Sequence, residues 1–168
     1  MTICDIIKNR RSIRSFLDNA VTKDDLSRLI EAASWAPSGK NIQPWRFAVV
    51  ADDNDLRNKI SELTIYRRWV KKAPCLIIVF LDRNISYDYE KDVMAIGASI
   101  QNLLLAAYEM QLGACWVGEI LKNKDKIKEM LGLQEHLEMV ALVAVGYTDS
   151  KDINGNRRDI NENVLLWK

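Results

Sequence analysis

The sequence feature that most constrains the fold is a long apolar segment at residues 91–111. Apolar side chains recur there at helical spacing on nearly every side, among them Val93, Ile96, Ile100, Leu103, Leu104 and Ala107. A helix that is hydrophobic all round has to be buried all round. In a chain of 168 residues this is easier when a second subunit covers one face. We therefore expect a long central helix that also takes part in a subunit interface.

Strand signals lie on both sides of this segment. Residues 75–81 form a continuous apolar run directly after Pro74, which is typical of a strand buried on both faces. Three further strands are expected at residues 45–51, 114–117 and 137–147, where β-branched and aromatic side chains are frequent. These runs predict the strands of one sheet.

Shorter helices are expected between the strands. Thr22 and Asp25 have the spacing of a capping box, and the helix that they open ends at residues 37–39. Residues 56–63 place apolar side chains on one face of another helix, and Asn123 can cap a third. Because helices and strands alternate without a regular βαβ period, we expect an α+β fold with one mixed or antiparallel sheet surrounded by helices.

Composition and charge narrow the class of protein further. A length of 168 residues predicts one domain, residues 1–168. A hydrophobic content of 48% and a net charge of +1 argue against a disordered chain and against a nucleic-acid binder. The first residues lack the apolar core of a secretory signal, and no apolar run approaches the ~20 residues of a membrane span. We expect a protein of the reducing cytoplasm with no membrane partner.

Common metal and catalytic signatures are absent. Cys4, Cys75 and Cys115 form no CxxC pair, so neither a zinc ribbon nor a disulfide framework is indicated. The single histidine, His136, cannot supply a multi-histidine metal site and lies in a polar segment before a strand. The glycines form no dinucleotide-binding, P-loop or nucleophile-elbow motif. We therefore expect no metal site.

Two basic clusters at opposite ends of the chain are suited to an anion. The first comprises Arg10, Arg11, Ser12 and Arg14, and the second comprises Arg157 and Arg158. Guanidinium groups bind phosphate oxygens bidentately, and a hydroxyl adds another donor. The two clusters can converge on one phosphate, while a solvated basic face is the competing interpretation.

Two further segments suggest contact with a planar ligand. The loop that joins a helix to a strand carries Pro37, Ser38, Gly39, Asn41 and Gln43. Its amides offer both donors and acceptors, which suits a heterocycle that has both. The segment Trp116-Val117-Gly118-Glu119 lies at a predicted strand end, where the glycine lets the backbone approach a ligand closely.

Taken together, these segments resemble the nitroreductase family of flavin enzymes. The similarity covers essentially the whole chain in order. It rests on Arg10-Arg11-Ser12-x-Arg14-x-Phe16, Pro37-Ser38-Gly39-x-Asn41-x-Gln43-Pro44-Trp45, the alanine- and leucine-rich helix, Gly113-x-x-Trp116-Val117-Gly118, the strand into Gly146-Tyr147, and the late arginines.

The resemblance implies a homodimer with FMN at the subunit interface and NAD(P)H as electron donor. Such an enzyme reduces nitroaromatics, quinones or similar small-molecule acceptors by ping-pong hydride transfer through flavin N5. Because the cofactor carries this chemistry, no catalytic side chain is required. The apolar helix then becomes the dimer helix. The tail from residue 148 onward, polar except for its apolar tip, is expected to drape over its own chain or wrap the partner.

The resemblance also implies roles for the four segments. Arg10, Arg11 and Ser12 should hold the FMN phosphate and ribityl chain, together with Arg157 or Arg158. Arg14 should approach the pyrimidine edge of the flavin. Residues 37–43 should contact the ring or ribityl chain from the other subunit, and the turn at 116–119 should offer a backbone N–H to flavin N5.

Two departures from the family pattern leave alternatives open. The segment at residues 82–90 is brief, which predicts an open pocket and identifies neither the acceptor nor a preference for NADH or NADPH. Residues 66–69 give no clear match to the amide and lysine that some members aim at the flavin, although Arg67 or Arg68 could substitute. The alternatives are dehalogenation, flavin fragmentation or dehydrogenation on the same scaffold, or a non-enzymatic anion or nucleic-acid binder.

Overall fold

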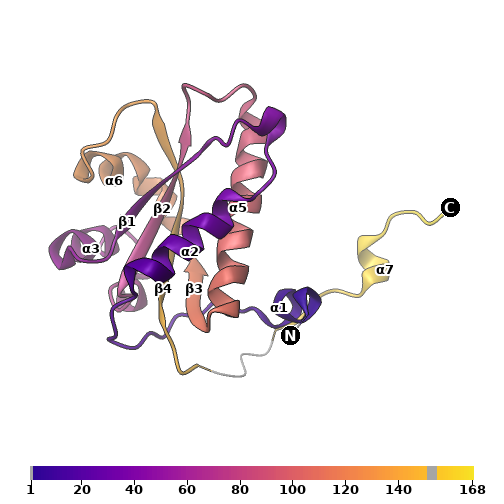
Figure 1. Cartoon of the computed structure of the whole chain (residues 1–168), viewed down its shortest axis with the longest axis horizontal. Helices are drawn as coiled ribbons and strands as arrows, with labels where there is room; N and C mark the ends of the chain where they lie inside the picture. Colours follow the sequence, from indigo (N-terminus) through magenta and orange to yellow (C-terminus); the bar gives the residue numbers. More distant parts are fainter. Residues whose placement is uncertain (1, 151–154) are drawn as a thin grey trace.

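A four-stranded antiparallel sheet forms the centre of the protein (Figure 1). The structure is a computed structural model of the whole chain, and it describes residues 2–150 and 155–168. The strand order is β1-β2-β4-β3. The strands are β1 (Trp45–Val50), β2 (Cys75–Asp82), β3 (Leu112–Trp116) and β4 (Leu137–Tyr147). The expected α+β fold is confirmed, and the sheet is antiparallel rather than mixed.

The continuous apolar run forms a central strand, β2, in which all residues are buried. It pairs with β1 on one side and with β4 on the other, so that Ile77 lies opposite both Val49 and Val143. The expected strand ended one residue earlier, because Asp82 is a charged residue at its end. Asp82 is 6% exposed and forms an ion pair with Arg46 at 2.9 Å, which compensates the buried charge.

Helices cover both faces of the sheet and make a three-layer arrangement (Figure 1). The α-helices are α1 (Ile3–Asn9), α2 (Lys23–Ser34), α3 (Asn54–Ser61), α4 (Arg67–Val70), α5 (Tyr89–Glu109), α6 (Lys124–Met130) and α7 (Ile160–Asn163). Two short 3₁₀ helices are η1 (Gly39–Asn41) and η2 (Glu119–Asn123). Helices α2 and α5 share one apolar core with the sheet, and α3, α4 and α6 share the other.

Within one chain, helix α5 is buried on every side except one stripe. Its sheet-facing and α2-facing side chains are buried, but Met94 is 72% exposed. Gln101 is also exposed, and Ala98 and Leu105 are partly exposed along the same stripe. A Cβ added at Gly97 would meet no atom within 4 Å. The single chain therefore leaves one small-residue and apolar stripe of this helix uncovered.

Several local predictions about helix and strand ends can be compared directly with the structure. Thr22 caps α2 as expected, because its hydroxyl accepts a hydrogen bond from the Asp25 amide at 3.1 Å. Asn123 precedes α6, but the prediction that its side chain caps the helix is wrong. Its amide instead donates to the Leu63 carbonyl at 2.7 Å. Gln111, at φ 59°, makes the turn from α5 into β3, which therefore begins before Gly113.

The C-terminal segment projects away from the sheet and its helices (Figure 1). Helix α7 lies in this projecting segment. Its Ile160 is 65% exposed, and Leu165 and Trp167 beyond it are 100% and 73% exposed. The apolar tip therefore does not pack on its own chain. Within the described residues, no helix has both the length and the apolar character needed to cross a bilayer.

Candidate functional site

The N-terminal basic segment lies along the outer edge of the sheet, beside β3. The Ile13 amide donates to the Ala114 carbonyl at 3.0 Å, and the Leu17 amide donates to the Tyr147 carbonyl at 2.8 Å. A Cβ on Gly113 would come within 2.7 Å of the Ile13 side chain, so this close approach requires glycine. Residues 10–17 thus form a strap along the sheet edge, and these contacts fix the backbone that carries the first arginine cluster.

Arginines from both ends of the chain come together at this edge. Burial of its own guanidinium, followed by the positive charges of Arg157 and Arg11, lowers the pKa of Arg10. Gly155 packs so closely on Arg11 that an added Cβ would lie 2.6 Å from the guanidinium Nε. Among the ion pairs of the described residues, none includes Arg10 or Arg157. Gathered like charges of this kind are suited to a multiply charged anion. Arg158 is exposed on the same segment.

Ser12 and Arg14 follow Arg10 and Arg11 in the chain. They lie beside Trp69 and Cys115, two residues that the sequence analysis did not assign to the site. The Arg14 guanidinium donates to the Ser12 carbonyl at 3.3 Å and lies 5.8 Å from the centre of the Trp69 ring. Burial raises the pKa of the Cys115 thiol, and the charge of Arg14 and a hydrogen bond with Ser12 oppose this effect. Residues 66–69, which the sequence left unmatched, therefore adjoin the cluster through Trp69.

The turn at residues 116–119 lies beside the same cluster. Val117 is buried and its amide donates to the Leu142 carbonyl at 2.8 Å, while Trp116 is exposed. Gly118 precedes η2, and the first N–H groups of any helix have no acceptor within it. The N–H of Glu119 is one of these.

The side chain of Glu119 is engaged elsewhere. One carboxylate oxygen accepts from the Thr64 hydroxyl at 2.6 Å and from the Ile65 amide at 3.1 Å, and the other pairs with Lys122. Lys122 first and Thr64 second lower the pKa of Glu119. The carboxylate therefore ties the turn to the segment before α4, so only the backbone of Glu119 is available to a ligand. No spacing in the sequence indicates this contact, because its partners are far apart in the chain.

The loop at residues 37–43 has an unusual backbone. Lys40, Asn41 and Gln43 have φ angles of 55°, 55° and 51°, in the left-handed region that non-glycine residues seldom adopt. The Ser38 hydroxyl accepts from the Gln43 amide at 3.0 Å, and the Gln43 side chain donates to the Asn41 carbonyl at 3.2 Å. Pro37 is exposed at the start of the loop. Strained conformations of this kind cluster at functional sites.

The candidate residues form two groups at opposite ends of α5. Figure 1 shows η1 beside the start of this helix and α1, which leads into Arg10, beside its far end. The helix has 21 residues, which at 1.5 Å per residue is about 31 Å long. One chain therefore does not bring residues 37–43 to the arginine cluster.

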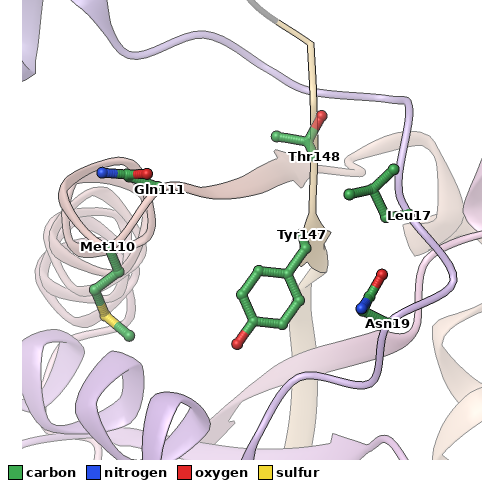
Figure 2. Close-up of a pocket in the computed structure, with 6 residues that line it drawn as sticks. All are labelled: Leu17, Asn19, Met110, Gln111, Tyr147 and Thr148. Carbon is green, nitrogen blue, oxygen red and sulfur yellow. The ribbon is translucent and has the colours of Figure 1, made fainter.

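A separate pocket of about 360 Å³ lies where α5, β4 and the N-terminal strap meet (Figure 2). It is lined by Leu17, Asn19, Met110, Gln111, Tyr147 and Thr148. The Tyr147 hydroxyl donates to Asp25 at 2.8 Å. None of the site residues expected from the sequence lines this pocket, so we do not assign the site to it.

Comparison with known proteins identifies the family of this chain. Residues 7–65 and 61–147 match the family model described as the nitroreductase family. An Archaeoglobus fulgidus protein described as a candidate NADH dehydrogenase/NAD(P)H nitroreductase is 34% identical over 152 residues, which cover 88% of this chain and 86% of its own. An iodotyrosine deiodinase of Thermotoga neapolitana is 29% identical over 170 residues, covering 86% of this chain and 88% of its own.

Solved structures agree with the sequence relatives. A Desulfovibrio desulfuricans protein, described as a candidate nitroreductase in complex with FMN, superposes with a TM-score of 0.94 at 38% identity. The superposition covers 100% of this chain and 98% of the other. The resemblance seen in the sequence motifs is thus confirmed over both sequence and fold, and the chain belongs to the nitroreductase family.

Proposed function

We propose that this protein is an FMN-dependent NAD(P)H oxidoreductase that acts as a homodimer with FMN at the subunit interface. The observation that carries the proposal is the convergence of Arg10, Arg11 and Arg157 at one sheet edge. The solved relative with FMN and the relative described as an NAD(P)H nitroreductase support the choice of cofactor and donor. The acceptor class is nitroaromatics, quinones or similar compounds.

The residues present fit the parts of FMN. A phosphate dianion suits partly buried guanidinium groups, and Arg10 is partly buried and forms no ion pair with a carboxylate of residues 2–150 or 155–168. Ser12 adds a hydroxyl, and the exposed Arg158 adds a further guanidinium. The exposed amides of Asn41 and Gln43 offer donors and acceptors to a heterocycle. When bound, FMN supplies N5, the atom that accepts hydride.

The chain's own residues orient and bind rather than react. Arg14, held against Trp69, places a positive charge beside the site. The N–H of Glu119 gives a fixed donor, because the side chain of this residue is held by Thr64 and Lys122. Preorganised donors of this kind cost little reorganisation during the reaction. The short connection between β2 and α5 leaves the site open to flat acceptors.

A dimer is needed because the two groups of site residues lie at opposite ends of α5. A twofold axis across the uncovered stripe of α5 would place two such helices antiparallel. Residues 37–43 of one chain would then lie beside the arginine cluster of the other, and two equal sites would form. The exposed apolar tip, Leu165 to Trp167, would pack on the partner, which explains why it finds no support on its own chain.

The proposed function is tested by cofactor content and by steady-state kinetics. We expect the purified protein to be yellow and its apo form to bind added FMN. With NADH or NADPH and a quinone or nitroaromatic, double-reciprocal plots at several acceptor concentrations should give parallel lines, as a ping-pong mechanism requires. A protein whose spectrum and melting temperature do not change with added FMN would overturn the proposal.

Reductive dehalogenation is a second candidate function, favoured by the similarity to the iodotyrosine deiodinase. It uses the same cofactor site and differs in the acceptor. The reduced protein should then release halide from a halotyrosine faster than it reduces a nitroaromatic. The reverse order of rates would favour the first candidate.

A further inference from the structure

Asp92, in the first turn of α5, is fully buried, with an exposure of 0%. Its Oδ2 accepts three hydrogen bonds, from the Ser86 hydroxyl at 2.7 Å, the Tyr87 amide at 3.1 Å and the Asp88 amide at 3.3 Å. Its Oδ1 is buried and has no hydrogen-bond partner among the described residues. All of its hydrogen bonds therefore go to one turn, residues 86–88, which Asp92 fixes at the start of the helix.

The turn fixed by Asp92 carries Tyr87, and the ring of Tyr87 lies directly against the η1 loop. A Cβ added to Gly39 would overlap the tyrosine hydroxyl, so the ring in this position packs against the bare glycine backbone. The Lys40 ammonium lies 4.8 Å from the centre of the ring, within the range of a cation–π interaction. The Lys91 ammonium lies 5.6 Å from the same ring. Tyr87 thus supports the loop from outside.

The loop needs such support because its backbone is strained. Lys40, Asn41 and Gln43 all have positive φ angles. Residues in this region keep their conformation only where the surrounding structure holds them. The Ser38–Gln43 hydrogen bond acts within the loop, whereas Tyr87 comes from another segment.

We infer that Asp92 is a positioning residue for the FMN-binding loop at residues 37–43, and that it acts through Tyr87. Asp92 does not touch the ligand. It holds the turn that places the Tyr87 ring, and the ring lies against Gly39 and Lys40, where it supports the strained loop that presents Asn41 and Gln43. This inference rests on the proposed role of the loop in binding FMN.

The experiment compares FMN binding by five variants, measured as quenching of flavin fluorescence on titration of the apo protein. The variants are Asp92→Ala, Asp92→Asn, Tyr87→Ala, Tyr87→Phe and the double variant Asp92→Ala with Tyr87→Ala. We expect Tyr87→Ala and Asp92→Ala each to raise the dissociation constant about tenfold. The double variant should bind no more weakly than Asp92→Ala alone, because both changes remove the same support.

Conservative variants and a matched control separate positioning from loss of structure. Tyr87→Phe keeps the ring and Asp92→Asn keeps an acceptor for the three donors, so both should stay within about threefold of the parent protein. The visible circular dichroism of bound FMN should change in Asp92→Ala, Tyr87→Ala and the double variant, but not in the two conservative variants. Tyr89→Ala is the control, because Tyr89 is a neighbouring tyrosine that contacts Arg83 and Glu138 instead of the loop.

The outcomes distinguish this inference from the proposed function. A parent protein that binds no FMN would overturn the proposed function. Parent binding with an unchanged dissociation constant in Tyr87→Ala, or additive losses in the double variant, would overturn the inference alone. If Asp92→Ala does not fold, the test depends on Tyr87→Ala, which changes a side chain of a residue that is 41% exposed.

Discussion

The positive charge of Arg157, near the end of the chain, lowers the pKa of Arg10, near its beginning. The two residues are brought together by the strap along β3 and by the packing of Gly155 on Arg11. Two like charges held close cost free energy unless an anion lies between them. A phosphate bound between the two guanidinium groups would therefore remove this cost.

Arg10→Ala should weaken FMN binding about 10- to 100-fold, since a hydrogen bond to a charged group contributes about 1.5–3 kcal/mol. Arg157→Ala and Arg158→Ala, measured separately by fluorescence titration, should show which of these two residues contacts the phosphate. Riboflavin, which lacks the phosphate, is the matched ligand: its affinity should be nearly equal in parent and Arg10→Ala. An equal loss for both ligands would contradict a phosphate contact. Arg28→Ala, an exposed arginine of α2 paired with Asp25, serves as the control variant.

The uncovered stripe of α5 leads to a prediction about assembly. Met94→Asp introduces a charge into the proposed interface, so light scattering should report a monomer where the parent is a dimer. The monomer should also bind FMN more weakly, because each site takes residues from both chains. Lys59→Asp is the control, since Lys59 is exposed on α3 at the opposite face of the sheet. A monomeric variant with unchanged FMN affinity would contradict the shared site.

Much of the fold could be predicted because its strongest signals are local. The limits of β4 follow from one apolar run, and the start of α2 follows from the Thr22 cap. Hydrophobic spacing predicts that α5 is buried on every side, but it does not distinguish a face covered by the same chain from a face left for a partner. The apolar run does not predict that β2 extends to Asp82, because the ion pair that compensates this charge comes from Arg46 on a neighbouring strand.

The candidate site could be predicted as a set of segments but not as an arrangement. The contact of Glu119 with Thr64 and that of Arg14 with Trp69 depend on tertiary structure, and no spacing in the sequence indicates them. The same is true of Tyr87, which supports Gly39 from a different segment. Motif resemblance identified the segments, while their division between the two ends of α5 emerged only from the structure.

Gly146→Ala should destabilise the protein because β4 passes very close to a rigid ring at this position. An added Cβ would lie 2.5 Å from the Pro74 ring and 3.0 Å from Phe16. Overpacking against groups that cannot rotate away costs about 1–3 kcal/mol. Urea denaturation should show a lower midpoint at an unchanged slope. An unchanged midpoint would mean that the strand shifts freely, which the pairing of β4 with both β2 and β3 opposes.

The hydrogen bond from Tyr147 to Asp25 predicts a dependence of stability on pH at both extremes. The bond to Tyr147, followed by that to Thr22, lowers the pKa of Asp25, so its stabilisation is present above the ordinary carboxylate pKa. This stabilisation is lost as the pH falls through the lowered value. The same bond raises the pKa of Tyr147, and this contribution is present below the ordinary tyrosine pKa and lost as the pH rises through the raised value.

Tyr147→Phe removes both effects and keeps the ring. Because the pair is only partly buried, the loss in unfolding free energy at neutral pH should be about 0.5 kcal/mol. The difference between parent and variant should shrink below about pH 3 and above about pH 11. Urea denaturation of parent and variant at about pH 2.5, about pH 7 and about pH 11.5 measures this difference in unfolding free energy. Asp25→Asn should lose the acid-side dependence while Thr22 still caps α2, and a difference that stays constant across this range would contradict the ionic character of the bond.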